Sequence, residues 1–213
     1  MDHGTGRTRI KVCGVRSYEI AMAAVEAGAD AIGFVFVPTS KRYIEPQAAY
    51  EIMINLPPMV ATVGVFKDQT IEEFLDIEET CPTTYTQLDG DEPQRFVQQV
   101  GPDVLRMLKF DADATPQALM VWDAVDEVGG LVMEGIGAEQ GPDQWESLAG
   151  MMDDVAKPLF LAGGVNAGNV GEAIRILKPY AVDVSSGVEI EKGTMDAEMI
   201  AEFCRAVREA DGD

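Results

Sequence analysis

Two side chains near the start of the sequence, Lys11 and Cys13, have the types and spacing to do chemistry together. They stand two residues apart in a short apolar run at residues 9–13. In a β-strand, residues at this spacing share a face, so the two side chains would lie on the same side. An ammonium favours the thiolate of a nearby cysteine, the form that serves as a base. The alternative is a buried structural cysteine, a common state for a free thiol.

An acid and a guanidinium complete the set of candidate chemical groups. Glu134 ends an apolar run at residues 130–134, and a partly desolvated carboxyl at such a place can act as a general acid. The alternative is a solvated loop carboxylate. Arg42 could bind a carboxylate through two hydrogen bonds. The net charge is −21, so an anionic ligand would need local cations, for which Lys11, Arg42 and Lys109 are the candidates.

Small residues follow two apolar runs near the C-terminus: Gly163, Gly164, Ser185, Ser186 and Gly187. Glycine lets the backbone approach a ligand closely. A short helix that begins near Ser186 would direct its positive end towards an anion. The pattern favours a phosphate site, and the alternative is a pair of tight turns that bind nothing.

The elements that must position these residues alternate along the whole chain. Apolar, β-rich runs predict eight strands at 9–13, 31–36, 60–66, 84–88, 104–109, 130–134, 158–162 and 180–184. Each is followed by a helical pattern, at about 17–28, 46–56, 70–79, 92–100, 116–125, 142–152, 168–177 and 195–209. Alternation of this kind predicts parallel βαβ units, and eight of them predict a single α/β domain, a (β/α)8 TIM barrel, over residues 1–213 with a flexible tail at 1–8. An open doubly wound sheet is the alternative. It would usually show G-x-G-x-x-G after the first strand, where Cys-Gly-Val-Arg stands at 13–16.

The barrel prediction brings the candidate residues together. Active sites of such barrels lie at the carboxyl ends of the strands, with phosphate bound by the loops after the seventh and eighth. Cys13 and Glu134 are predicted to end the first and sixth strands. We therefore expect them to face one mouth, beside the glycine- and serine-rich loops.

Bulk composition excludes several other classes of function. The chain has 37 Asp and Glu residues against 16 Lys and Arg, a balance that repels nucleic acid and anionic membranes. No apolar run approaches the roughly 20 residues of a membrane span, and the polar N-terminus lacks a signal-peptide pattern, so we expect a cytoplasmic protein. Three scattered cysteines and one histidine, His3, predict neither a disulfide framework, a metal site nor a Ser-His-Asp triad.

Six segments, in order along nearly the whole chain, resemble motifs of the phosphoribosylanthranilate isomerase family. They are Lys-Val-Cys-Gly at 11–14, the run 29–36 with Ser-Lys-Arg-Tyr-Ile at 40–44, Val-Gly-Val-Phe at 63–66, Gln-Leu-Asp-Gly-Asp-Glu at 87–92, Leu-Ala-Gly-Gly-Val at 161–165, and Asp-Val-Ser-Ser-Gly-Val-Glu at 183–189.

The resemblance implies an Amadori rearrangement of N-(5-phosphoribosyl)anthranilate in tryptophan biosynthesis, without metal or organic cofactor. It assigns the base to Cys13 and the acid to Glu134. It assigns substrate binding to Lys11, to Arg42, which would bind the anthranilate carboxylate, and to Asp183, which would contact the sugar or amine. It assigns phosphate binding to Gly163, Gly164, Ser185, Ser186 and Gly187. The implied partner is the small-molecule phosphoribosyl substrate alone, with no nucleic acid and no membrane, and the chain is expected as a monomer or homodimer.

Three departures from the family pattern stand in the middle of the chain. Glu134 replaces the usual Asp, Asp89 replaces the usual His of Q-L-H-G, and the loop at 135–145 is short and lacks the family's glycine-rich run. Because of these departures, the alternative is a divergent paralogue that binds a phosphosugar without catalysing this reaction, or that acts on another phosphosugar. A ribulose-phosphate-epimerase-like enzyme is a third possibility, but it would want a set of metal-binding histidines.

Overall fold

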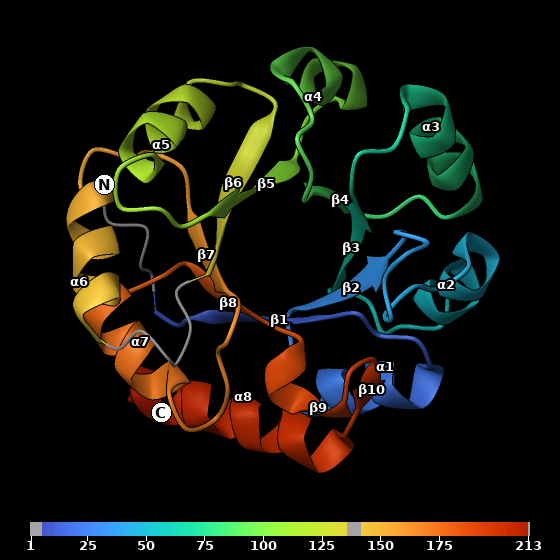
Figure 1. Cartoon of the computed structure of the whole chain (residues 1–213). Helices are drawn as coiled ribbons and strands as arrows, with labels where there is room; N and C mark the ends of the chain where they lie inside the picture. The colour runs from blue at the N-terminus through green and yellow to red at the C-terminus, as the bar shows by residue number, and fades with distance from the viewer. Residues whose placement is uncertain (1–5, 136–141, 213) are drawn as a thin grey trace.

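The computed structural model describes residues 6–135 and 142–212, and they form a closed barrel (Figure 1). Eight parallel strands follow one another in sequence order, and the last pairs with the first. They are β1 (Arg9–Cys13), β2 (Ala31–Val35), β3 (Ala61–Phe66), β4 (Tyr85–Leu88), β5 (Val104–Lys109), β6 (Val128–Glu134), β7 (Leu159–Ala162) and β8 (Ala181–Val184). Pairing of β1 with β8 closes the sheet, which confirms the predicted TIM barrel and excludes the open doubly wound sheet.

Helices follow the strands and ring the barrel on its outside (Figure 1). They are α1 (Tyr18–Glu26), α2 (Pro46–Met53), α3 (Ile71–Thr80), α4 (Gln94–Val100), α5 (Thr115–Asp123), α6 (Pro142–Met151), α7 (Val170–Leu177) and α8 (Ala197–Asp211). Local chemistry sets several of their starts. Ser17 caps α1 as predicted, by accepting a hydrogen bond from the Ile20 N–H, and Thr70 forms a capping box with Glu73 at α3.

Between β8 and α8 the short helix expected near Ser186 is present as a 3-10 helix, η1 (Ser186–Val188). It leads into a hairpin of β9 (Glu189–Glu191) and β10 (Thr194–Met195) that the sequence pattern did not predict. At the other end, Arg7 and Thr8 belong to the expected tail. Thr8 is buried and its N–H and hydroxyl both donate to Asp211, while Arg7 forms an ion pair with Asp30. Both residues are therefore held against the barrel.

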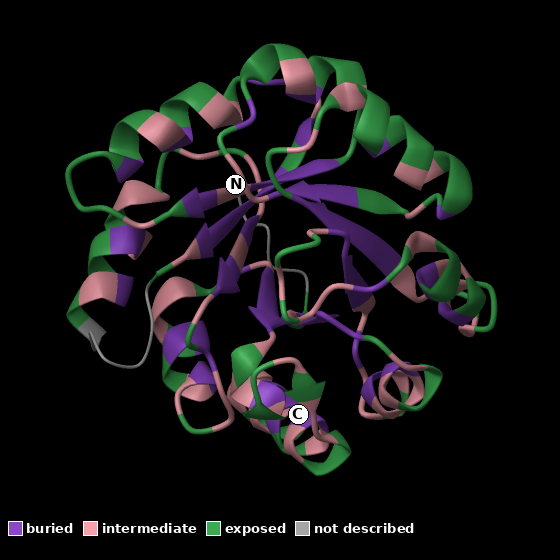
Figure 2. Cartoon of the chain, turned by 45° about the vertical axis from the view of Figure 1, so that its right-hand side comes forward, coloured by how far each residue is buried: buried purple, intermediate pink, exposed green. Residues whose placement is uncertain are grey.

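The strands of the barrel are largely buried (purple in Figure 2), and alternation along them places apolar side chains on both faces of the sheet. On β1, Ile10 and Val12 belong to the large core between barrel and helices. Inside the barrel a small layer contains Val63, Leu105, Val132 and Ala162, and a second contains Cys13, Val35 and Val65. Lys11 and Cys13 thus share the inner face of β1, as their spacing predicted.

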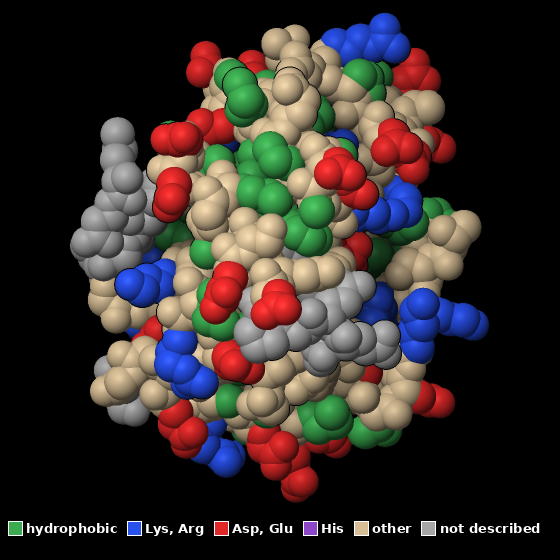
Figure 3. Space-filling model, turned by 60° about the vertical axis from the view of Figure 1, so that its left-hand side comes forward, with side chains coloured by type: hydrophobic (Ala, Val, Ile, Leu, Met, Phe, Trp, Pro, Cys, Tyr) green, Lys and Arg blue, Asp and Glu red, His purple; other side chains and the backbone are tan. Residues whose placement is uncertain are grey.

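The outer surface carries the acidic excess of the sequence. On the face shown in Figure 3, Asp and Glu side chains are spread among a smaller number of Lys and Arg side chains. None of the described helices is long and apolar enough to cross a membrane.

Candidate active site

A cavity of about 290 Å³ opens at the carboxyl ends of the strands, where the barrel prediction placed the site. Every one of the eight strands, or the loop that follows it, contributes to its wall. The lining residues are Cys13, Val35, Val37, Thr39, Ser40, Arg42, Val65, Lys67, Gln87, Asp89, Met107, Glu134, Ala162, Gly163, Asp183 and Ser185. The structure therefore brings Cys13, Arg42, Glu134, Gly163, Asp183 and Ser185 from the predicted set into one cavity wall.

Lys11 lies beneath this cavity rather than in its wall. The side chain is 1% exposed, and its Nζ donates to Asp183 Oδ2 over 2.8 Å. Burial alone would lower the pKa of Lys11, but the carboxylate of Asp183 and the nearby Cys13 outweigh it and raise that pKa. The ammonium therefore keeps its proton and acts on the cavity through Asp183, which does line it.

Lys11 favours the Cys13 thiolate, as expected, but burial outweighs this effect. Burial raises the pKa of Cys13 to about 12, and the opposing effect of the Lys11 ammonium is too small to reverse the shift. The carboxylates of Asp183 and Asp89 add to the rise. The main physical reason is burial of the thiol, and the Lys11 ammonium that opposes it is itself paired with Asp183. At neutral pH the resting group is the thiol.

Glu134 ends β6, and its half-buried side chain lies over the loop after β7. Gly163 makes that approach possible. A Cβ at position 163 would lie 2.7 Å from Cγ of Glu134 and 3.0 Å from the Gly135 N. The backbone of Gly163 is also left-handed, with φ of 76°, a conformation that favours glycine. The glycine after β7 thus leaves room for a Glu at the end of β6.

The loops after β7 and β8 touch one another, as a shared phosphate site would need. Gly163 and Gly164 are consecutive left-handed residues, and the Gly164 carbonyl accepts from the Asn169 side chain. A Cβ on Gly187 would lie 2.0 Å from the Val165 carbonyl oxygen, so only glycine allows this contact. Ser185 and Ser186 stand at the start of η1, directly after β8.

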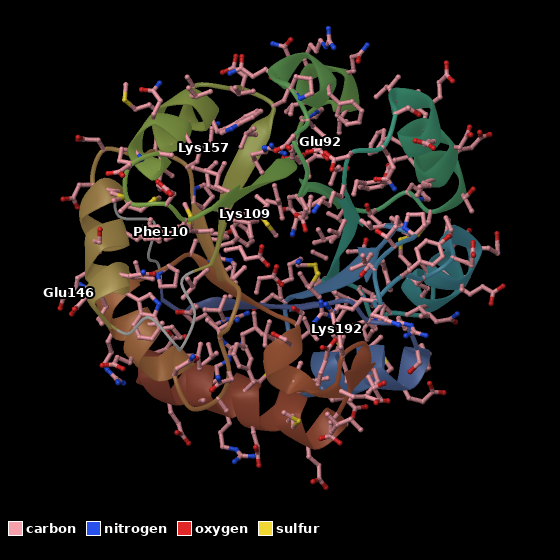
Figure 4. The ribbon with its side chains drawn as sticks, viewed as in Figure 1. Glu92, Lys109, Phe110, Glu146, Lys157 and Lys192 are labelled. Atoms are coloured by element: carbon pink, nitrogen blue, oxygen red, sulfur yellow. The ribbon has the colours of Figure 1, made fainter. Side chains whose placement is uncertain are left out.

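Arg42 reaches the cavity from the loop after β2. Its guanidinium lies beside Glu189, with Nε 2.7 Å from Oε1 and Nη2 2.8 Å from Oε2. Lys109, the third expected cation, is exposed at the end of β5 (Figure 4) and lines a neighbouring hollow instead. Of the three cations, Arg42 is the one that meets the cavity directly.

Comparison with known proteins gives this arrangement a family. A family model described as N-(5'phosphoribosyl)anthranilate (PRA) isomerase matches residues 10–206, which include β2 to β8 and all of β1 but its first residue. The chain belongs to the N-(5'-phosphoribosyl)anthranilate isomerase family.

Individual relatives agree over nearly their full length. The N-(5'-phosphoribosyl)anthranilate isomerase of Dechloromonas aromatica is 40% identical over 207 residues, covering 96% of this chain and 98% of that protein. A crystal structure of phosphoribosyl anthranilate isomerase in complex with reduced 1-(o-carboxyphenylamino)-1-deoxyribulose 5-phosphate has a TM-score of 0.83 at 34% identity, covering 95% of this chain and 99% of that one. A structure of monomers generated from the dimeric isomerase of Thermotoga maritima has a TM-score of 0.83 at 33% identity, with the same coverage.

Asp89, which stands where the PRA isomerase motif usually has His, lines the cavity. The sequence marked Asp89 as a departure at a strand end but assigned it no role in the site. Its Oδ1 accepts from Gln87 Nε2 over 2.8 Å. Burial raises the pKa of Asp89 to about 7, even though the Gln87 hydrogen bond and the Lys11 ammonium oppose the shift.

Two hydrogen-bond acceptors in the wall of this PRA isomerase site have no donor among the described residues. Gln87 Oε1 and Asp183 Oδ1 are buried and have no hydrogen-bond partner among the described residues. Both residues line the cavity. The sequence assigned Gln87 no role, and Lys67, which also lines the cavity, was missed. A buried acceptor without a partner is costly, so both oxygens suit a ligand that brings N–H or O–H groups.

A buried ion pair holds the loop that carries Asp89. Arg106 of β5 donates to the carbonyls of Leu88 and Gly90, and its Nη1 lies 2.6 Å from Glu92 Oε2. Glu92, labelled in Figure 4, accepts in turn from the Gly90 N–H. These contacts bracket Asp89 on both sides. The expected short loop after β6 includes residues 136–141, which lie outside the described part of the chain.

Proposed function

We propose that this chain isomerises N-(5'-phosphoribosyl)anthranilate to 1-(2-carboxyphenylamino)-1-deoxyribulose 5-phosphate, with Cys13 as general base and Glu134 as general acid. The reaction is the Amadori rearrangement of tryptophan biosynthesis that the family carries out. The observation that supports these roles is that Cys13 and Glu134, from β1 and β6, line one cavity together with Arg42 and the loops after β7 and β8.

The rearrangement takes three steps. Glu134 donates a proton to the furanose ring oxygen as the bond from C1 to that oxygen breaks, and the anilino nitrogen forms a double bond to C1. Cys13, entering as the thiolate, removes the proton on C2; the released pair forms the C1–C2 double bond of an enol while the pair of the C1–N double bond returns to the anilino nitrogen. Protonation at C1 and loss of the enol hydroxyl proton then produce the ketone.

The buried position of Cys13 affects this step in two opposing ways. Because its pKa is raised to about 12, only a small fraction is thiolate at neutral pH. The same rise makes each thiolate a stronger base towards carbon acids such as the C2–H. We propose that the cavity exploits a rare but strongly basic thiolate.

Residues of the cavity wall, and others in the loops beside it or in the barrel beneath it, would anchor the two ends of the substrate. Arg42 binds the anthranilate carboxylate, and Gly163, Gly164, Ser185, Ser186 and Gly187 bind the phosphate through backbone N–H and hydroxyl groups. Asp183 accepts from the amine or a sugar hydroxyl through its unpartnered Oδ1, while Lys11 holds the other oxygen.

The loss of substrate fluorescence on adding purified protein tests the proposal. Cys13→Ser and Glu134→Gln keep the side-chain shapes and remove the base and the proton donor, so each should lower kcat by at least about a hundredfold. Cys81→Ser, at a buried cysteine at the end of α3, and Glu146→Gln, on the exposed side of α6 (Figure 4), are the matched controls and should retain full activity. A wild type that binds a phosphosugar without turnover would refute the isomerase and favour the divergent paralogue.

We also propose that the chain forms a homodimer through the amino-terminal face of the barrel. Met59 is 99% exposed there, in a left-handed conformation that is rare for a side chain of its size. It borders a hollow of about 240 Å³ that Tyr85 and Phe160 help to line, so one face offers both a projection and a recess. Light scattering of the wild type should give twice the mass of one chain. Met59→Asp should halve this measured mass, whereas Met120→Asp on α5 should leave it unchanged. A wild-type mass of one chain would refute the dimer.

A further inference from the structure

Arg42 is paired with Glu189 through a complete edge of its guanidinium. Nε donates to one carboxylate oxygen over 2.7 Å and Nη2 to the other over 2.8 Å, the parallel geometry of the strongest arginine–carboxylate pairs. The Glu189 side chain is 4% exposed and that of Arg42 is 18% exposed. A glutamate this deeply buried is held by its partner and cannot swing freely into solvent.

The pairing leaves a second edge of the same guanidinium free. Arginine has five N–H donors, of which Glu189 uses the Nε–H and one Nη2–H. Nη1 and the other Nη2–H have no partner among the described residues, and together they form the end-on edge of the fork. Arg42 lines the cavity and Glu189 does not, so this end-on edge is the one left to meet a ligand there.

Both partners are held from behind by close backbone packing. A Cβ on Gly14 would lie 2.5 Å from Cδ of Arg42, so the arginine stem lies directly on the loop after β1. The hairpin that carries Glu189, labelled at Lys192 in Figure 4, packs against the Arg42 loop at its tip. There a Cβ on Gly193 would lie 2.5 Å from the Lys41 carbonyl, which also accepts from Arg16.

We propose that Glu189 is a positioning residue that sets the specificity of the cavity, because it holds the Arg42 guanidinium with its end-on edge presented to the substrate's aromatic carboxylate. The proposal rests on the proposed function for the identity of that carboxylate. It deepens that function by assigning a role to the hairpin β9–β10, which the catalytic steps themselves do not use.

The pair has two physical consequences for recognition. Holding the guanidinium in place removes the rotamer entropy that a free arginine would lose on binding. Glu189 also compensates the positive charge, so attraction to any anion is weakened while the two-pronged hydrogen-bond geometry remains. A planar carboxylate is then favoured over an anion that offers charge alone, which suits a cavity that also binds a phosphate at its other end.

The experiment compares two ligands that differ only in the carboxylate. Turnover is measured for the substrate N-(5'-phosphoribosyl)anthranilate and for the analogue made from aniline and ribose 5-phosphate. Binding of their reduced, non-reacting ketose forms is measured by calorimetry. The variants are Glu189→Gln, Arg42→Ala and the double variant, with Glu191→Gln as the control because Glu191 is an exposed glutamate on the same strand. Thermal melting checks that every variant is folded.

The expected result is a loss of affinity for the ligand with the carboxylate and not for the aniline ligand. Glu189→Gln should raise KM and the Kd of the carboxylate ligand about tenfold or more, with kcat changed less than about threefold, and leave the aniline ligand unaffected. It should add no further loss in the Arg42→Ala background, and Glu191→Gln should behave as wild type. Equal losses for both ligands, or an additive loss with Arg42→Ala, would overturn the proposal. A wild type that binds both reduced ligands without turnover would refute the isomerase function alone, since the binding comparison still reports on Glu189.

Discussion

Replacing Lys11 with methionine should strongly destabilise the barrel, although the new side chain is apolar and similar in length. Lys11 and Asp183 are 1% and 6% exposed, and their charged atoms lie 2.8 Å apart. Lys11→Met would leave the Asp183 carboxylate buried without a cation, while its Oδ1 already has no partner among the described residues. Breaking a buried pair from one side costs about 3–5 kcal/mol, a large part of the roughly 5–15 kcal/mol that stabilise a typical domain.

Urea unfolding at pH 8 measures this cost directly. The pKa of Lys11 is raised above its ordinary value of 10.5, so the stabilising contribution of the pair is fully present below that pH and is lost only as the pH rises further. The matched control is Lys157→Met, because Lys157 is a partly buried lysine whose Nζ donates to the Val128 carbonyl. That variant removes one hydrogen bond without stranding a carboxylate, so it should cost only about 1 kcal/mol.

A double-variant cycle separates a stranded charge from simple loss of packing. Asp183→Asn alone strands the ammonium, whereas Lys11→Met with Asp183→Asn removes both charges. The double variant should therefore be more stable than Lys11→Met alone. The reasoning is refuted if Lys11→Met lies within about 1 kcal/mol of wild type, or if the two single effects simply add.

Three further outcomes follow from groups around the same cavity. Because the pKa of Cys13 is raised to about 12, its alkylation by iodoacetamide, followed by peptide mass spectrometry, should rise about tenfold per pH unit from 7 to 9, and a plateau in that range would contradict the raised pKa. Burial raises the pKa of Asp89 from 3.8 to about 7, so the folded protein should lose up to about 4 kcal/mol of stability as the pH rises between these values. Asp89→Asn should abolish that decline in urea unfolding at pH 4 and pH 8, and an unchanged decline would assign it to other groups. Gly187→Ala places a Cβ against the Val165 carbonyl and should lower kcat/KM about a hundredfold. The control Gly150→Ala, whose Cβ meets open space, should leave kcat/KM unchanged. Equal kcat/KM values for the two variants would show that activity does not depend on the contact between the two loops.

Local sequence pattern was enough to predict most of the fold, because each strand and helix carries its own signal. The eight apolar runs and the helix starts at Ser17 and Thr70 depend on residues only a few positions apart. The hairpin β9–β10 was not predicted. Its strands have three and two residues, too few for a period-2 pattern to emerge, and it is held by docking on the Arg42 loop.

The sequence by itself determined the barrel, the placement of Cys13 and Glu134 at strand ends and the glycines that bring two loops together, because strand periodicity and backbone freedom are local properties. Only the tertiary structure decided how those groups are charged and paired. Lys11 meets Asp183 from 172 residues away, and Arg42 meets Glu189 from 147 residues away. Burial and distant partners govern a pKa and the direction of a guanidinium, so the resting thiol at Cys13 and the free edge of Arg42 emerge only when the barrel closes.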